Sequence, residues 1–200
     1  GLNTWPGILA QYWLNRISAR WQADPDGWRG LAENEKAALF TMLTSDTAAG
    51  STATGIIAGK LHFLFAADSD FARDNLLSLF DPERPEFTSD AWYSFLHEAS
   101  TPPDLLDAGF WDVAIRARMS APAAGEGRLS DRYWLMMAGI AVHSTAECVD
   151  RPALVRTLSE PASDNDLPAL LDAIAFYARD LDSASKTDLW ETWLKNALET

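Results

Sequence analysis

The segment Gly59–Asp81 constrains the fold of this 200-residue chain more than any other. Residues 56–67 are apolar on nearly every side of a helix, which is typical of a helix buried on several sides. A buried strand is the alternative, but the run is longer than most strands and rich in alanine, which favours a helix. Residues 68–70 then offer side-chain oxygens that can cap a second helix, which Asp81-Pro82 ends. Because so few residues join the two helices, the pattern predicts an antiparallel helical hairpin at the centre of the fold.

The first helix carries an unusually aromatic stripe. Its members recur at helical spacing: Trp5, Leu9, Trp13, Ile17 and Trp21, with Ile8 and Tyr12 widening the stripe. Surface helices generally bury such a stripe, so we expect it to belong to the core. The alternative is an aromatic ridge that binds a partner.

Helical spacing recurs along the rest of the chain, without an alternating strand pattern of useful length. We expect further helices around residues 31–43, 88–96, 105–118, 129–143, 150–158, 167–181 and 186–198. Residues 45–54 and 120–128 are predicted loops because they are rich in glycine and other small residues. The fold class is therefore all-α, with about ten helices in one domain over residues 1–200. Stacked hairpins of the HEAT or solenoid type and an irregular helical bundle both fit, since the sequence shows no clean repeat period.

Charge and composition exclude several classes of partner. The net charge is −13, with an isoelectric point near 4.5. Binding to nucleic acid or to an anionic membrane surface needs clustered Lys and Arg, so neither is expected. The charge favours a basic partner, although acidity alone is a weak indication of one.

A cytoplasmic location is expected from the cysteine content and the N-terminus. Cys148 is the only cysteine, so no internal disulfide can form, which fits a reducing compartment. The sequence shows neither a signal peptide nor a segment long and apolar enough to span a membrane. The chain begins with Gly1 rather than Met, so we expect a piece of a longer protein.

Three histidines and the cysteine are the first candidates for chemistry. They are His62, His97, His143 and Cys148. No histidine has a second histidine or cysteine three or four residues away, so the usual zinc pair is absent. We expect each histidine to be satisfied by backbone groups. A Cys148–His143 nucleophile pair beside Glu147 is conceivable, but the sequence offers no third group to orient it.

Acidic and basic clusters are the second candidates. The acidic groups are Asp68, Asp70 and Asp74, then Asp104 and Asp107, then Asp164 and Asp166. The pair at 104 and 107 shares one helix face, so a metal site is possible there, but helix capping is the expected role of all three groups. The scarce basic residues include Arg73, Arg116, Arg118, Arg128 and Arg132, which we expect to pair within the chain. No nucleotide-binding, hydrolase or metalloprotease motif is present. The sequence therefore predicts no catalytic residue, no cofactor and no metal.

Several segments resemble an uncharacterised C-terminal region of large bacterial proteins. The resemblance is carried by Leu61–Arg73 and Leu76–Asp81, by the Thr4-Trp5-Pro6-Gly7 start of the tryptophan helix, and by Asp90–Leu96. Some of these proteins carry a sirtuin-like NAD-consuming domain at the N-terminal end and are thought to act in defence against phage. The resemblance implies a sensing, scaffolding or assembly module whose chemistry lies elsewhere in the parent protein. It implies no functional residue, because none is assigned in this region.

Two functions remain as hypotheses, beside a purely structural spacer. The first is a non-catalytic interaction module that binds another protein or a domain of its own parent chain. The second is a helical enzyme or ligand-binding domain with a pocket among the aromatic helices, near His62 or His143. An exposed aromatic patch would favour the module, whereas a deep cavity with convergent His, Asp and Arg side chains would favour the second. Oligomeric state does not follow from the sequence.

Overall fold

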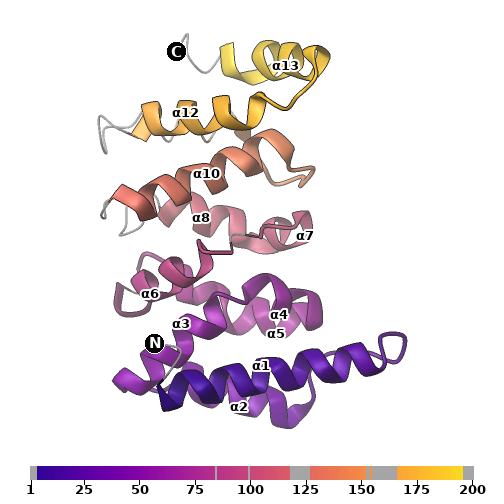
Figure 1. The fold of residues 1–200 in the computed structure, drawn as a ribbon, viewed down its shortest axis with the longest axis vertical. Helices are drawn as coiled ribbons and strands as arrows, with labels where there is room; N and C mark the ends of the chain where they lie inside the picture. The colour runs from indigo at the N-terminus through magenta and orange to yellow at the C-terminus, as the bar shows by residue number, and fades with distance from the viewer. Residues whose placement is uncertain are drawn as a thin grey trace. The chain divides into compact units, whose positions relative to one another are not determined.

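The computed structural model describes residues 4–83, 85–98, 100–117, 127–151, 154 and 166–195. Every regular element in these ranges is helical, and no strand occurs among them, so the predicted all-α class is confirmed (Figure 1). Contacts within the chain divide it into two compact units, Gly1–Ser100 and Thr101–Thr200. The single domain over residues 1–200 stays a prediction. None of the described helices is long and apolar enough to cross a membrane.

The first unit is built around one small-residue helix, α3. Its elements are α1 (Trp5–Ala23), α2 (Glu33–Leu43), α3 (Ala48–Ala58), α4 (Leu61–Ala67), α5 (Ser69–Asn75), a 3-10 turn (Leu77–Phe80) and α6 (Pro85–Phe95). Helix α3 packs against α1, α2 and α6. Pro85 begins α6, earlier than the predicted start at residues 88–90, because proline suits the first turn of a helix.

The loop predicted at residues 45–54 is wrong, because most of it belongs to α3. Thr47 caps this helix, and its Oγ1 accepts a hydrogen bond from the Gly50 N–H at 3.1 Å. Gly55 and Gly59 allow close approach to α6, since a Cβ there would lie 3.2 Å and 3.3 Å from Ser94 side-chain atoms. Helix propensity disfavours these residues, but close packing against α6 outweighs it.

The predicted central hairpin exists, although its first helix is shorter than expected. The backbone breaks at Gly59-Lys60, so residues 56–67 belong partly to α3 and partly to α4. Helices α4 and α5 are in contact and only Asp68 separates them. The Asp68 carboxylate accepts from the Phe71 N–H at 3.0 Å, which confirms the predicted cap. It also accepts from the Leu31 N–H at 3.1 Å and pairs with Lys36 at 2.9 Å. Asp68 therefore ties the hairpin to the start of α2.

An aromatic cluster closes the core of the first unit. Phe80 lies edge-on to Trp92 and to Phe95, with ring centroids 5.1 Å and 5.4 Å apart. The Trp92 Nε1–H donates to the Phe80 carbonyl at 3.2 Å, so the indole is buried with its polar atom satisfied.

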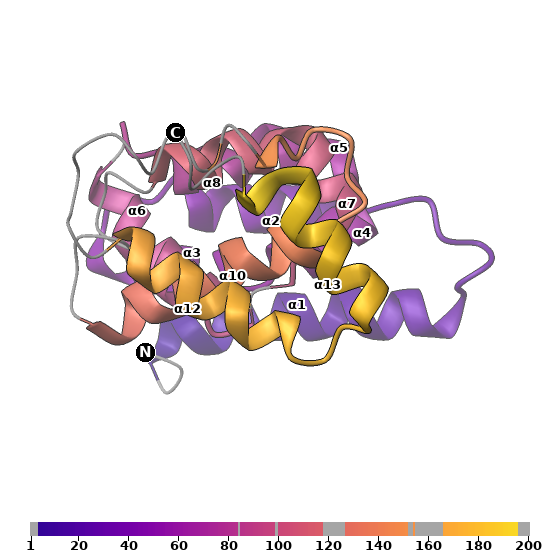
Figure 2. The same cartoon turned by 90° about the horizontal axis from the view of Figure 1, so that it is seen from above.

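The second unit contains two long helices that lie side by side. Its elements are α7 (Pro103–Leu105), a π-helical turn (Leu106–Phe110), α8 (Trp111–Ala117), α10 (Gly127–His143), α12 (Asp166–Ala178), α13 (Ser183–Leu189) and a second π-helical turn (Trp190–Leu194). Helices α10 and α12 are in contact, and α12 crosses over α10 in Figure 2. The Tyr133 hydroxyl on α10 donates to the Ala114 carbonyl of α8 at 2.8 Å. Residues 120–126 of the predicted loop at 120–128 lie outside the described residues. Most of the predicted helix at 150–158 also lies outside them.

Candidate functional site

The three histidines have different surroundings. His62 on α4 is half-buried, and its Nδ1 is buried without a hydrogen-bond partner in the described structure. Burial lowers the pKa of His62, with Glu98 acting in the opposite sense. His97 is exposed and its Nδ1 bonds the Tyr93 carbonyl at 2.6 Å, while the His143 ring lies edge-on to Tyr177. His97 thus meets a backbone group as predicted, whereas His62 Nδ1 does not.

Cys148 lacks the surroundings of a nucleophile. Its backbone N–H donates to Asp107 Oδ1 at 2.9 Å. Burial and the neighbouring Asp107 carboxylate raise the pKa of the Cys148 thiol to about 12, so it stays protonated at neutral pH. His143 packs on Tyr177 instead of activating the thiol.

The predicted capping role is confirmed for Asp68, whereas Asp70, Asp74 and Asp107 have other partners. Asp68 caps α5, and Asp107 accepts from the Cys148 amide, which lowers the Asp107 pKa. Asp70 and Asp74 both pair with Arg73, as expected for pairing within the chain. No group of three or more His, Cys, Asp or Glu side chains that could hold a metal ion occurs in the ranges described. Asp164, Arg118 and the side chains of Arg128 and Asp166 lie outside those ranges.

The prediction that the α1 stripe belongs to the core is wrong for its first half. Trp5 is 76% exposed and Tyr12 54% exposed, and Ile8 and Leu9 are exposed beside them. We call these four residues the outer face of α1. Ile17 is buried as predicted, and Trp21 stacks on Trp28 with ring centroids 5.2 Å apart.

Small residues explain why the aromatic side of α1 is left outside. The residues that α1 buries are Gly7, Ala10, Leu14 and Ile17. These lie on the opposite side of the helix from the outer face, because residues three to four apart share one side. Glycine and alanine allow α1 to lie close to its neighbours, including α3. Helix α1 is therefore apolar on two sides, and only one of them faces the core.

A groove beside α1 is the second feature of the first unit. It has a volume of about 720 Å³ and lies between α1, α3 and α6. Its lining includes Gln11 on α1, Gly55 on α3, and Tyr93 and His97 from α6 and the residues after it. Lys60 and Glu98 also line it and form an ion pair. The groove is mostly apolar and open to solvent, whereas a typical small-molecule site encloses most of its ligand.

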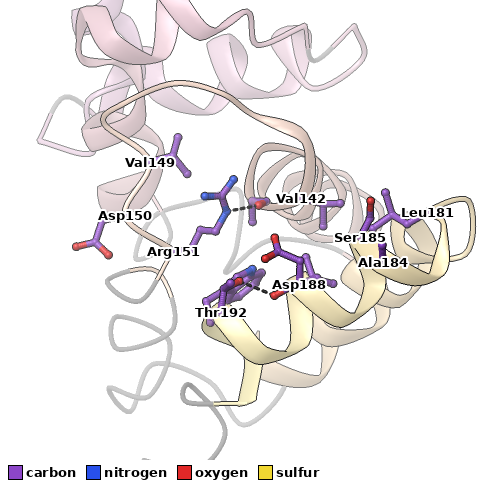
Figure 3. Close-up of a pocket in the computed structure, with 12 residues that line it drawn as sticks. Val142, Val149, Asp150, Arg151, Leu181, Ala184, Ser185, Asp188 and Thr192 are labelled. Carbon is purple, nitrogen blue, oxygen red and sulfur yellow. Dashed lines mark hydrogen bonds between the residues drawn. The ribbon is translucent and has the colours of Figure 1, made fainter.

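A groove of about 750 Å³ in the second unit contains an arginine (Figure 3). The Arg151 Nε–H donates to the Ala141 carbonyl at 2.6 Å and an Nη2–H donates to the Ser144 carbonyl at 3.1 Å. The guanidinium therefore sits at the C-terminal end of α10, where the helix dipole favours a cation. The Asp188 carboxylate on α13 points toward it in Figure 3. Sequence reasoning missed Arg151, because it follows α10 by eight residues and belongs to no motif.

Comparison of the chain with protein-family models, with curated proteins and with solved structures finds no match. Function must therefore be argued from these surfaces.

Proposed function

We propose that this chain is a non-catalytic helical module that binds another protein through the outer face of α1. The observation that carries this proposal is the exposure of Trp5, Ile8, Leu9 and Tyr12 on one side of a single helix. Tryptophan and tyrosine are enriched among residues that dominate binding energy, because each buries a large area for little loss of side-chain freedom.

The surroundings of the polar side chains support the same proposal. The Cys148 thiol is protonated, the carboxylates of Asp68 and Asp107 accept backbone hydrogen bonds, and both grooves are open. We further propose, from the resemblance noted above, that the module senses or scaffolds within a larger bacterial protein. The single cysteine supports a reducing, cytoplasmic setting for it.

The test compares the native chain with two variants as affinity baits in a lysate of the source cells. One bait carries Trp5→Asp with Tyr12→Asp, and the control carries Phe176→Asp, at an aromatic position on α12 that is as exposed as Tyr12. We expect the native and control baits to retain a specific protein. The bait with Trp5→Asp and Tyr12→Asp should retain at least about tenfold less of it. Circular dichroism should show unchanged helix content for both variants, since all three side chains are exposed. Equal retention by all three baits would contradict the proposal.

A helical ligand-binding domain is the second candidate, supported by the Arg151 groove. Apolar side chains such as Val142 and Leu189 line it beside the Arg151 guanidinium and the carboxylates of Asp150 and Asp188, which suits a small molecule with an amide group. A thermal-shift screen with such compounds, repeated on Arg151→Lys, would support this candidate only if a shift in Tm is lost in the variant.

A further inference from the structure

We infer that the partner of the outer face is an amphipathic helix with an acidic residue that pairs with Arg16. This inference rests on the proposed function and names the chemistry of the partner at the same site. It has two parts, the helical form of the partner and the position of its charge.

The helical form follows from the row of residues that α1 presents. Trp5, Leu9, Tyr12 and Arg16 stand at i, i+4, i+7 and i+11, so they follow one line along the helix, and all four are exposed. This ridge is about 16 Å long at 1.5 Å rise per residue. A ridge with this spacing fits the groove between side-chain rows of a second helix, which repeats at the same interval. Recognition by an amphipathic helix uses anchors at the same spacing.

The acidic residue follows from the environment of Arg16. This arginine makes no ion pair within the described structure, and its guanidinium carbon lies 5.6 Å from the Trp13 ring centroid. Arg16 contributes weakly to lowering the pKa of Glu35, but that carboxylate already accepts hydrogen bonds from Arg20 at 2.7 Å and 3.0 Å and from the Ala32 N–H at 2.8 Å. A helix that covers the ridge would remove water from Arg16. Burying an unpaired charge is costly, so the covering helix must supply a carboxylate.

The local charge of α1 agrees with this pairing. The first 23 residues contain two arginines and no Asp or Glu, although the whole chain has a net charge of −13. Because Arg20 is paired with Glu35, Arg16 is the arginine of α1 that is left to attract a carboxylate on the covering helix. A second copy of the chain is disfavoured, because two molecules of this net charge repel each other.

The experiment uses synthetic peptide helices as probes of the full chain. Each peptide is about 20 residues long, enough to populate a helix, with leucines spaced to face Trp5, Leu9 and Tyr12. Three versions carry Glu, Gln or Lys about 11 residues from the first leucine, opposite Arg16. Fluorescence anisotropy of the labelled peptides gives the Kd for the native chain and for the variants Arg16→Glu and Arg179→Glu. Arg179 directly follows α12 and is exposed, so Arg179→Glu is a control with the same change of charge.

We expect the native chain to bind the Glu peptide roughly tenfold more tightly than the Lys peptide, with the Gln peptide between them. Arg16→Glu should reverse that order, and Arg179→Glu should leave it unchanged. The preference should shrink at high salt, because salt screens exposed charges.

Four results would overturn the inference. Equal binding of the Glu and Lys peptides would contradict the acidic residue proposed for the partner. The proposed function would still stand if Trp5→Asp with Tyr12→Asp abolished peptide binding. If none of the peptides binds while retention of a lysate protein still depends on Trp5 and Tyr12, the helical form of the partner is contradicted and the proposed function stands. Self-association of the chain in sedimentation that the double variant loses would identify a second copy as the partner. Binding to neutral lipid vesicles that the double variant loses would identify a membrane surface instead. Loss of every dependence on Trp5 and Tyr12 would remove the proposed function as well.

Discussion

At the scale of single residues, Glu35 shows how a buried charge is made tolerable. Its side chain is 1% exposed. Burial alone would raise the pKa of Glu35, but hydrogen bonds from Arg20 and from the Ala32 N–H outweigh burial and lower the pKa below the ordinary value of a glutamate. Arg20 also donates to the Gly30 carbonyl at 2.8 Å, so one guanidinium joins α1 to the turn before α2. The ion pair therefore fixes the geometry between two helices.

The lowered pKa predicts an acid-dependent loss of stability. A carboxyl group with a depressed folded-state pKa contributes stability above its unfolded pKa and loses it as the pH falls through the folded value. We expect the free energy of unfolding to fall as the pH drops below about 4.5, and Glu35→Gln to flatten this dependence. At pH 7 the substitution should cost about 2 kcal/mol, the typical worth of a hydrogen bond to a charged group. Urea unfolding between pH 3 and 7 measures both effects, with the exposed Glu33→Gln as control. Parallel pH profiles for the two variants would contradict this account of Glu35.

At the scale of helices, hydrophobic spacing predicted most elements but wrongly placed the first half of the α1 stripe in the core. The class, the helix ending at His143 and the cap at Asp68 follow from local rules of spacing and capping. The packing role of α3 does not follow from them, because its two glycines, one serine and two threonines are typical of a loop, and only the contact with α6 favours a helix. The spacing of Trp5 and Tyr12 predicts an apolar stripe, but it does not predict that the stripe is exposed. Helix α1 has a second apolar side, made of smaller residues, and that side packs against the core.

The close contact of α3 with α6 predicts a specific sensitivity to size. Gly55 faces α6, where a Cβ would lie 3.2 Å from Ser94 Oγ, so the two γ-carbons of valine have no space. We expect Gly55→Val to lower the free energy of unfolding by about 2 kcal/mol, the usual cost of overpacking a core. Ala49→Val, at an exposed position of the same helix, is the matched control and should cost well under that amount. Chemical denaturation of both variants makes the comparison. Equal losses would show that β-branching, rather than contact with α6, limits this helix.

At the scale of the whole chain, each compact unit has a core of its own. The first unit buries large side chains that include Leu39, Ile57, Leu64, Phe80, Trp92 and Phe95. The second buries Phe110, Trp111, Tyr133, Trp134, Met137 and Leu170. About 100 residues are enough for an independently stable core. The proposed binding surface on α1 lies entirely within the first unit.

We therefore expect residues 1–100 to fold without the second unit and to keep the outer face of α1 functional. The isolated fragment should unfold cooperatively on heating, because its own core supplies the packing that a two-state transition requires. It should also bind the Glu peptide with a Kd within about threefold of the full chain, since Trp5, Tyr12 and Arg16 are all present. Circular dichroism follows the melting, and anisotropy gives the Kd. Gly55→Val in the fragment is the control for folding, and its melting temperature should fall as it does in the full chain. A fragment that shows helix content without a cooperative transition would mean that the first unit needs the second to complete its core.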